Sequence, residues 1–218
     1  GEHDAEFYAE MWCQIKNQGF WRGRISNRRK SGQVITQMET ISAVIDAHGK
    51  VQQYIAVFSD ITQLVEQQKL LERMAHYDSL TGLPNRVLFA EHMKQAMARA
   101  RRSGRMLAVC YLDLDGFKPV NDRFGHAVGD QLLIEVADRL KRYMRGGDSM
   151  ARLGGDEFAV LIGDIDDMLS CEFALDRLIE ALIDTYEIDD GETVRIAASI
   201  GVTLFPQDDV DPDALLRH

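Results

Sequence analysis

Apolar and polar residues alternate with two different periods along the first 60 residues. A helical spacing over Glu6–Gln14 precedes three runs with the period-two alternation of β-strands. These runs cover Gly19–Asn27, Val34–Asp46 and Val51–Asp60, and Gly, Ser and Asp residues mark turns between them. We therefore predict a helix followed by a small three-stranded sheet.

Residues 61–77 contain neither Gly nor Pro and have a helical apolar pattern. The apolar positions are Ile61, Leu64, Leu71 and Ala75, with Gln68 between them. This three-and-four spacing is typical of a coiled-coil seam. The segment is predicted to be either a parallel dimer helix, in which Gln68 sets the register, or an amphipathic helix packed on its own chain.

Beyond a Gly- and Pro-containing hinge, the pattern predicts an α+β domain. The expected elements are a helix over 86–103, a strand over 106–112, a helix over 129–143, a hairpin of 150–153 with 158–162, a helix over 168–186 and a strand over 194–204. Their order is that of a βαββαβ core preceded by a helix.

Two acidic clusters stand out in this second part. The continuously apolar run Met106–Leu112 predicts a strand buried on both faces that carries Asp113 at its end, and Asp115 follows. Asp156 and Glu157 follow the glycine pair Gly154-Gly155 at the expected hairpin tip. Alone, each cluster is most often a solvated turn or strand end. On neighbouring strands they would suit Mg²⁺ with substrate phosphates.

Composition and charge restrict the function classes. Lys and Arg total 25 against 35 Asp and Glu, a net charge of −10, which argues against nucleic-acid binding. Cys13, Cys110 and Cys171 are too far apart to indicate a disulfide framework or a zinc site. No run approaches the ~18 apolar residues of a membrane span, so we expect a cytoplasmic location and leave open a membrane anchor upstream.

The first part resembles the C-terminal half of a PAS sensor domain. The resemblance is carried by Gly19–Gly23, Asn27–Gly32 and Ser59–Thr62. It implies a partial PAS segment over 1–60, a signalling linker helix over 61–77 and a second domain over 78–218. The sensed ligand belongs to the half that this sequence does not contain.

The second part is similar to GGDEF-domain diguanylate cyclases. The matching segments are Tyr111–His126, Gly129-Asp130, Arg152–Phe158 and Ala198–Val202, with Asp78–Arg86 as the N-terminal motif. The resemblance implies a ferredoxin-like, nucleotidyl-cyclase-like fold. It also implies that two GTP condense to cyclic di-GMP with release of pyrophosphate, one GTP being held by each domain of a homodimer.

The same resemblance assigns the catalytic roles. Mg²⁺ or Mn²⁺ would be held by Asp113, the carbonyl of Leu114, and Asp156. Either Asp156 or Glu157 would assist deprotonation of the attacking ribose hydroxyl. The phosphate-binding assignments are Lys118 and Arg152, with Gly154 and Gly155 making room for the phosphates.

Guanine would be read by Asn121 and Asp130, since a carboxylate accepts from the N1 and N2 hydrogens that adenine lacks. His126, in the same matched run, is also assigned to substrate binding. Asp130 as a helix N-cap and Asn121 as a loop former are the alternatives.

Arg145-Gly146-Gly147-Asp148 resembles the product-inhibition motif of the family, which binds cyclic di-GMP. The alternative is a helix end, with Arg145 on the helix dipole and Gly146 as the C-cap.

The chain ends at Asp213–His218, where the family continues into a helix with a phosphate-contacting Lys and Arg, so we expect this fragment to be impaired. Two other functions stay open. One is a non-catalytic GTP- or cyclic di-GMP-binding module, placed ahead of a phosphodiesterase domain. The other is a cyclic di-GMP receptor that works through Arg145 and Asp148 with its catalytic face unused. A PAS-type interaction module without a nucleotide role would not explain the paired acidic clusters.

Overall fold

The computed structural model describes residues 3–188 and 192–208, and the segment Asp213–His218 lies outside these residues. The chain divides into two compact units, Gly1–Glu72 and Arg73–His218. No helix among the described residues is long and apolar enough to cross a membrane.

The first unit contains the predicted helix and three strands. Its elements are α1 (Ala5–Gln18), β1 (Phe20–Arg28), β2 (Val34–Ile45) and β3 (Val51–Asp60), and the strands form an antiparallel sheet in the order β1-β2-β3. The apolar face of α1 packs on the sheet through Met11, Ile15, Trp21, Ile25 and Ile41. The helix runs further than predicted because Gly19, at φ 82°, provides the left-handed C-cap, and its N–H donates to the Ile15 carbonyl.

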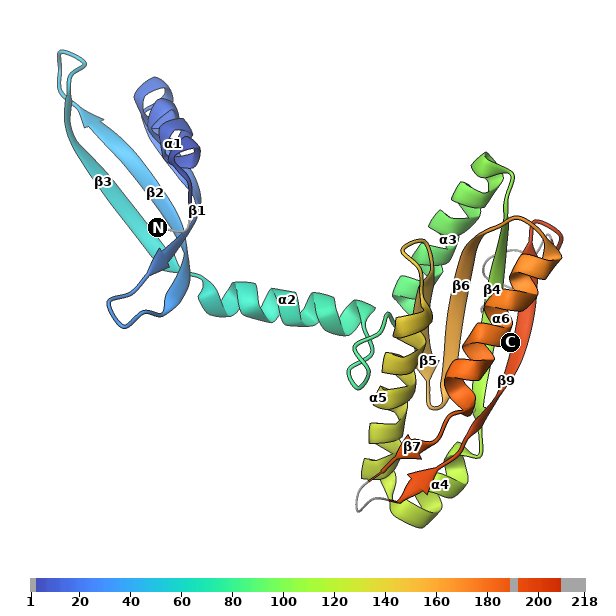
Figure 1. The fold of residues 1–218 in the computed structure, drawn as a ribbon. Helices are drawn as coiled ribbons and strands as arrows, with labels where there is room; N and C mark the ends of the chain where they lie inside the picture. Colours follow the sequence, from blue (N-terminus) through green and yellow to red (C-terminus); the bar gives the residue numbers. More distant parts are fainter. Residues whose placement is uncertain (1–2, 189–191, 209–218) are drawn as a thin grey trace. The chain divides into compact units, whose positions relative to one another are not determined.

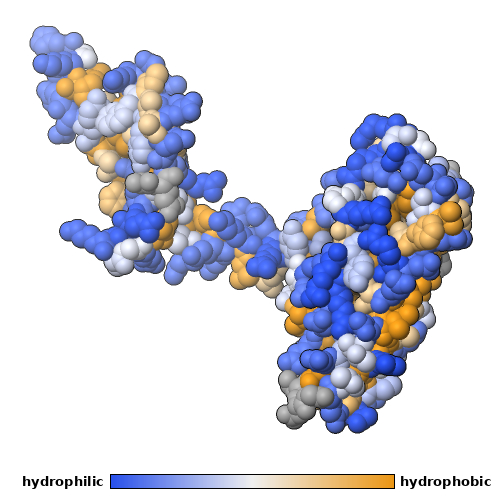
Figure 2. Space-filling view, in the orientation of Figure 1, coloured by the Kyte–Doolittle hydropathy of each residue, from blue (hydrophilic) through white to orange (hydrophobic). Residues whose placement is uncertain are grey.

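Helix α2 (Thr62–His76) agrees with the predicted helical segment, and none of its residues is buried. The apolar side chains of Leu64 and Leu71 are 63% and 66% exposed. Figure 2 shows hydrophobic residues among hydrophilic ones on the visible face of this helix. In a parallel dimer helix, a second copy of the chain would cover this stripe. The dimer stays a prediction.

The second unit has the predicted βαββαβ order (Figure 1). Its main elements are α3 (Arg86–Ser103), β4 (Met106–Asp115), α4 (Phe117–Phe124), α5 (His126–Tyr143), β5 (Ser149–Gly154), β6 (Glu157–Ile165), α6 (Met168–Ile183) and β9 (Ala197–Phe205). The sheet is antiparallel, in the order β5-β6-β4-β9.

Both faces of this sheet are covered along most of β4. Alternate residues of β4, such as Cys110 and Leu112, pack in one core with α5 and α6. Leu107 and Val109 pack on the other face with α3. The strand is therefore buried on both sides, as its continuous apolar run predicts.

Several elements and boundaries differ from the prediction. Helix α4 was not predicted, α5 begins at His126 rather than Gly129, and α6 ends at Ile183 rather than near Tyr186. A small hairpin of β7 (Tyr186–Glu187) and β8 (Thr193–Val194) precedes β9, which begins at Ala197 rather than Val194.

Tertiary contacts explain the early end of α6. The Tyr186 ring is buried, its hydroxyl donates to the Leu182 carbonyl at 3.2 Å, and the Arg139 guanidinium lies 3.8 Å from the ring centroid. The Arg139 guanidinium also donates to the carbonyls of Asp184 and Thr185, at 3.1 and 2.6 Å. These contacts hold the chain in an extended form that helical periodicity alone did not reveal.

Candidate active site

The glycine pair forms the predicted hairpin tip between β5 and β6. Gly154 pairs with Glu157, and Gly155 and Asp156 form the turn between them. Gly154 and Gly155 have φ values of 147° and 53°, which side chains rarely adopt. We call residues Gly154–Glu157 the signature turn; its shape depends on both glycines.

The central position of β4 brings the two acidic clusters together. In the sheet register, Asp113 lies opposite Glu157 of β6 on one side and Ser199 of β9 on the other. Asp115 is two residues further along the same face of β4, and the Ser199 hydroxyl donates to its carboxylate oxygens at 3.1 and 3.0 Å. Acidic side chains thus gather where β4 extends beyond the apolar core.

The acidic side chains at this edge repel one another. Burial raises the pKa of Asp113, and the negative charges of Asp156 and Asp115 raise it further. A bound cation would favour the charged carboxylates and remove this repulsion.

Two carboxylates with a nearby backbone carbonyl fit Mg²⁺ or Mn²⁺, since Mg²⁺ commonly takes its remaining ligands from water and substrate phosphates. Within 3–188 and 192–208, no three His, Cys, Asp or Glu side chains form a cluster able to hold a metal ion.

Replacing Asp113 with Asn should raise the melting temperature of the metal-free protein at neutral pH. Because its pKa is raised on folding, ionised Asp113 opposes folding above that pKa, and protonation at lower pH relieves the repulsion. The stabilisation by Asp113→Asn should therefore shrink as the pH falls through the pKa of Asp113. Thermal melts in chelator between pH 4 and 8 test this, and a lower melting temperature at pH 8 would contradict it.

A cavity of about 420 Å³ lies beside these acids on β4 and β9. It is lined by Tyr111, Leu112, Asp113, Glu157, Ser199, Ile200 and Gly201. Tyr111 lies between Gly201 and Ala159 in the register, and these small neighbours leave the space open. Sequence reasoning gave Tyr111 no role, although its position two residues before Asp113 places it on the same face of the strand.

Arg86 also belongs to this edge of the domain and was not assigned a role. Its Nη2 lies 3.8 Å from a carboxylate oxygen of Glu157, and both side chains are about half exposed. An ion pair this exposed contributes little to stability. It does place a positive charge beside the acids of the signature turn.

The predicted guanine-reading residues lie on two helices that pack together. Asn121 is on α4, and Asp130 is exposed within α5, so it is not the helix N-cap. The Asn121 Oδ1 atom is buried and has no hydrogen-bond partner among the described residues. It lies against Gly129, where an added Cβ would collide with it. A buried, unpaired amide oxygen of this kind suits a ligand donor.

The starts of α4 and α5 carry two further predicted site residues. Lys118 lies in the first turn of α4, His126 is the first residue of α5, and both are exposed. The residue before α4 is Gly116, which has no side chain to cap the helix. The first N–H groups of α4 therefore have no side-chain cap from this residue, an arrangement that suits phosphate oxygens.

Arg152 makes contacts other than the predicted phosphate contact. Its Nη1 is 3.0 Å from Oδ1 of Asp78, and its Nε and Nη2 donate to the Gly155 carbonyl at 3.0 and 2.8 Å. Its side chain is only 11% exposed. Phosphate binding by Arg152 stays a prediction.

The Arg145–Asp148 motif lies in the loop between α5 and β5. The Asp148 carboxylate accepts from the N–H of Arg145 at 2.9 Å and from that of Gly163 at 3.2 Å. The alternative interpretation makes Gly146 the C-cap of helix α5. The helix ends earlier than that, with Met144 as its C-cap. Arg177 of α6 lines a small cavity with Arg145 and Asp148, a neighbour that sequence spacing did not indicate.

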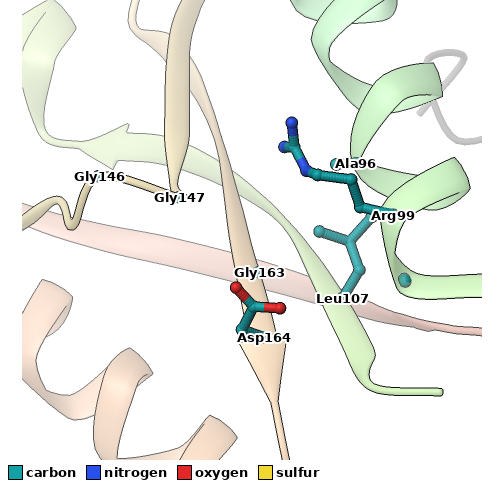
Figure 3. A pocket seen from close by; sticks show the side chains of 8 residues that line it. Ala96, Arg99, Leu107, Gly146, Gly147, Gly163 and Asp164 are labelled. Carbon is teal, nitrogen blue, oxygen red and sulfur yellow. The ribbon is translucent and has the colours of Figure 1, made fainter. Parts of the chain in front are cut away.

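A second cavity, of about 240 Å³, borders the same loop on the side of α3. Arg99 of α3 and Asp164 of β6 line it together with Gly146 and Gly147 (Figure 3). Asp164 has φ 55°, an unusual value for a residue with a side chain. The motif loop is thus accessible from two sides.

The family follows from comparison with known proteins. Residues 75–218 match the model described as "Diguanylate cyclase, GGDEF domain". The chain belongs to the GGDEF family.

Individual relatives agree with this assignment. The chain is 42% identical over 164 residues to the bifunctional diguanylate cyclase/cyclic di-GMP phosphodiesterase MucR of Pseudomonas aeruginosa, a match that covers 72% of this chain and 24% of MucR. It is 39% identical over 155 residues to the diguanylate cyclase TpbB of the same species, covering 71% of this chain and 36% of TpbB. The chain therefore matches about a quarter to a third of the length of these relatives.

Solved structures show the same fold. The GGDEF domain of TpbB superposes with a TM-score of 0.62 at 40% identity, covering 65% of this chain and 82% of that one. The coiled coil and GGDEF domain of DgcB from Caulobacter crescentus, in complex with cyclic di-GMP, gives a TM-score of 0.62 at 26% identity, covering 72% and 82% of the two chains. The predicted ferredoxin-like α+β domain is confirmed as a GGDEF fold.

Proposed function

We propose that the protein is a diguanylate cyclase that condenses two GTP into cyclic di-GMP and releases pyrophosphate. The observation that carries this is the strand register that places Asp113 of β4 opposite Glu157 at the signature turn, where burial and then the charge of Asp156 raise the pKa of Asp113. The similarity to MucR and TpbB supports the same reaction.

In this proposal Asp113, the Leu114 carbonyl and Asp156 hold Mg²⁺ or Mn²⁺, which would neutralise charge on the triphosphate. The uncapped start of α4 and Lys118 bind phosphate oxygens. Asp156 or Glu157 accepts the proton of the ribose 3′-hydroxyl that attacks the α-phosphate of the other GTP. Each transferred proton thus moves to a carboxylate within the domain.

Guanine is bound in this proposal between α4 and α5. The unpaired Oδ1 of Asn121 accepts a hydrogen bond from the base, and Asp130 accepts from the N1 and N2 hydrogens. In adenine, Asp130 would face the N1 lone pair and a C2–H in place of the two N–H donors, which supports selectivity for GTP. His126, at the start of α5, contacts the same nucleotide.

Each domain holds one GTP, so the reaction needs two domains facing each other. The exposed apolar stripe of α2 supports a parallel dimer through this linker helix. We propose the division into a partial PAS segment over 1–60, a linker over 61–77 and a GGDEF domain over 78–218. A cytoplasmic location follows in this proposal from the use of GTP as substrate.

Cyclic di-GMP is proposed to inhibit the enzyme by binding at Arg145 and Asp148, to which Arg177 adds a second guanidinium. Replacing Arg145 with Ala should weaken cyclic di-GMP binding about ten-fold or more, since charge-assisted contacts are lost. Calorimetry with cyclic di-GMP measures this affinity. Initial rates should stay as in the wild type, and unchanged affinity would remove the inhibitory site.

The direct test is to incubate the protein, extended past His218, with GTP and Mg²⁺ and to separate the products by chromatography. Cyclic di-GMP and pyrophosphate in a 1:2 ratio are expected. The similarity to the bifunctional protein MucR favours one alternative, a regulatory GGDEF module ahead of a phosphodiesterase domain. GTP binding without product would support that alternative and exclude the cyclase.

A further inference from the structure

The loop between α2 and α3, residues 77–85, is closed by its own hydrogen bonds. The Asp78 N–H donates to the Leu83 carbonyl at 2.8 Å, and the Gly82 N–H donates to the Asp78 carbonyl at 2.9 Å. The Asp78 carboxylate accepts from the N–H and the hydroxyl of Thr81, at 2.8 and 2.6 Å. We call residues 77–85 the anchor loop. These contacts fix its shape independently of its neighbours.

Asn85 ties the anchor loop to the helices on both sides. Its backbone N–H and its Nδ2 each donate at 2.9 Å, to the carbonyls of His76 and Ala75. Its Oδ1 accepts from the first N–H groups of α3, those of Val87 and Leu88, at 3.0 and 3.1 Å. One side chain thus caps the end of α2 and the start of α3.

Arg152 ties the anchor loop to the signature turn. Its Nη1 reaches both carboxylate oxygens of Asp78 at 3.0 and 3.2 Å, and its backbone N–H donates to the Pro84 carbonyl at 3.0 Å. Its other two side-chain nitrogens donate to the Gly155 carbonyl. Every nitrogen of Arg152 therefore has an acceptor within the domain.

Hydrogen bonds to the Gly155 carbonyl affect the position of the Asp156 side chain. It belongs to the peptide group whose N–H is that of Asp156, so its direction sets where the Asp156 side chain starts. Glycine has the least restricted backbone, and Gly155 has φ 53°. Without an external hydrogen bond, this peptide would sample several orientations relative to Asp113.

We propose that Arg152 is a positioning residue, and that with Asp78 it joins the last turn of α2, through the anchor loop, to the peptide that carries Asp156. This rests on the proposed function, in which Asp156 holds the metal. The linker helix would then act on each active site directly through hydrogen bonds as well as by bringing two domains together.

The two roles considered for Arg152, positioning the signature turn and binding phosphate, predict different effects of the Asp78→Asn substitution. If Arg152 positions the turn, Asp78→Asn and Arg152→Gln should have similar effects, and the double variant should be no worse than the more severe single one. If Arg152 binds phosphate, Asp78→Asn would leave the guanidinium free for GTP, and only Arg152→Gln would weaken GTP binding.

The first experiment measures kcat and KM of the dimeric protein with GTP. Both single variants should lower kcat about ten-fold or more with KM within about two-fold, because displaced catalytic groups cost rate more than binding. Arg152→Lys should recover little, since an ammonium cannot reproduce the fork that joins Asp78 to Gly155. A wild-type KM and kcat in Asp78→Asn would overturn the proposal.

The second experiment does not depend on activity. Amide hydrogen exchange of residues 153–157 should be faster in Asp78→Asn and Arg152→Gln than in the wild type. The matched control is Arg105→Gln, which breaks an exposed Arg105–Asp166 pair at 3.2 Å in the same domain and should change neither exchange nor rate. Unchanged exchange at 153–157 in both variants would overturn the proposal even if the protein proves not to be a cyclase.

Discussion

Replacing Asp156 with Asn is expected to lower the rate of cyclic di-GMP formation by about 10³-fold. The loss follows because a metal ligand and a nearby negative charge disappear together, and each tenfold in rate corresponds to about 1.4 kcal/mol of barrier. Initial rates with GTP and Mg²⁺, together with Mn²⁺ affinity by electron paramagnetic resonance, measure the effect. Both quantities should fall in this variant.

Glu157→Gln separates the roles of the two adjacent acids. Glu157 lies opposite Asp113 and its side chain is 57% exposed, whereas Asp156 lies in the turn and its charge raises the pKa of Asp113. We expect Glu157→Gln to lose rate while retaining Mn²⁺ affinity. Loss of Mn²⁺ binding in Glu157→Gln but not in Asp156→Asn would reverse the assignment.

A carboxylate far from the site provides the control. Asp138 on α5 forms an exposed ion pair with Lys141 at 3.1 Å. Asp138→Asn makes the same chemical change as Asp156→Asn and should leave both rate and metal affinity within about two-fold of the wild type. A large effect of Asp138→Asn would indicate that losing a negative charge anywhere in the domain lowers the rate. The Asp156 result would then not depend on the position of Asp156 in the site.

Replacing Gly129 with Ala should abolish most of the selectivity for GTP while leaving the fold intact. An added Cβ at position 129 would collide with the Asn121 amide. Because Gly129 is buried in α5, we expect the Asn121 amide to relieve the collision by turning away. The amide is the end of a flexible side chain, and Ala favours a helix by about 0.5–1 kcal/mol over Gly. The ring of buried Phe117 also lies 3.2 Å from the added Cβ and must shift, which offsets this gain, so the melting temperature should change little.

Binding of GTP and ATP analogues, measured by calorimetry, checks this prediction. The ratio of their affinities should fall about ten-fold or more, since a guanine-reading acceptor is lost. Gly146→Ala is the control, because an added Cβ there meets no atom within 4 Å. If Gly129→Ala keeps the wild-type ratio, Asn121 does not read the base.

Sequence reasoning found most of the regular elements because their patterns are local. The alternation in β1 to β3 and the continuous apolar run of β4 are present in consecutive residues. Helix α4 was not found because it is short, contains Pro119, and is bounded by Gly116 and Gly125, which favoured a loop interpretation. Its position depends on packing against α5.

The candidate site was found only in part. Motif residues such as Asp113, Asn121 and Asp156 are adjacent to recognisable glycines and strands, whereas Arg177 carries no local signal and enters its cavity through helix packing. Tyr111 shares a strand face with Asp113, but only the strand register shows that it lines a cavity. The contacts of Arg152 were also not foreseen, since Asp78 is 74 residues away in sequence. Such contacts depend on which loops the fold brings together.

The amino-acid sequence by itself determined the family, the two-part organisation and the presence of both acidic clusters, because these depend on residue type and short-range spacing. The tertiary structure decided that β4 lies between β6 and β9, so that Asp113 faces Glu157 and Ser199. It also decided that Arg152 spans from Asp78 to Gly155. The physical reason is that strand order and loop contacts arise from burying the two faces of one sheet, which no local segment specifies.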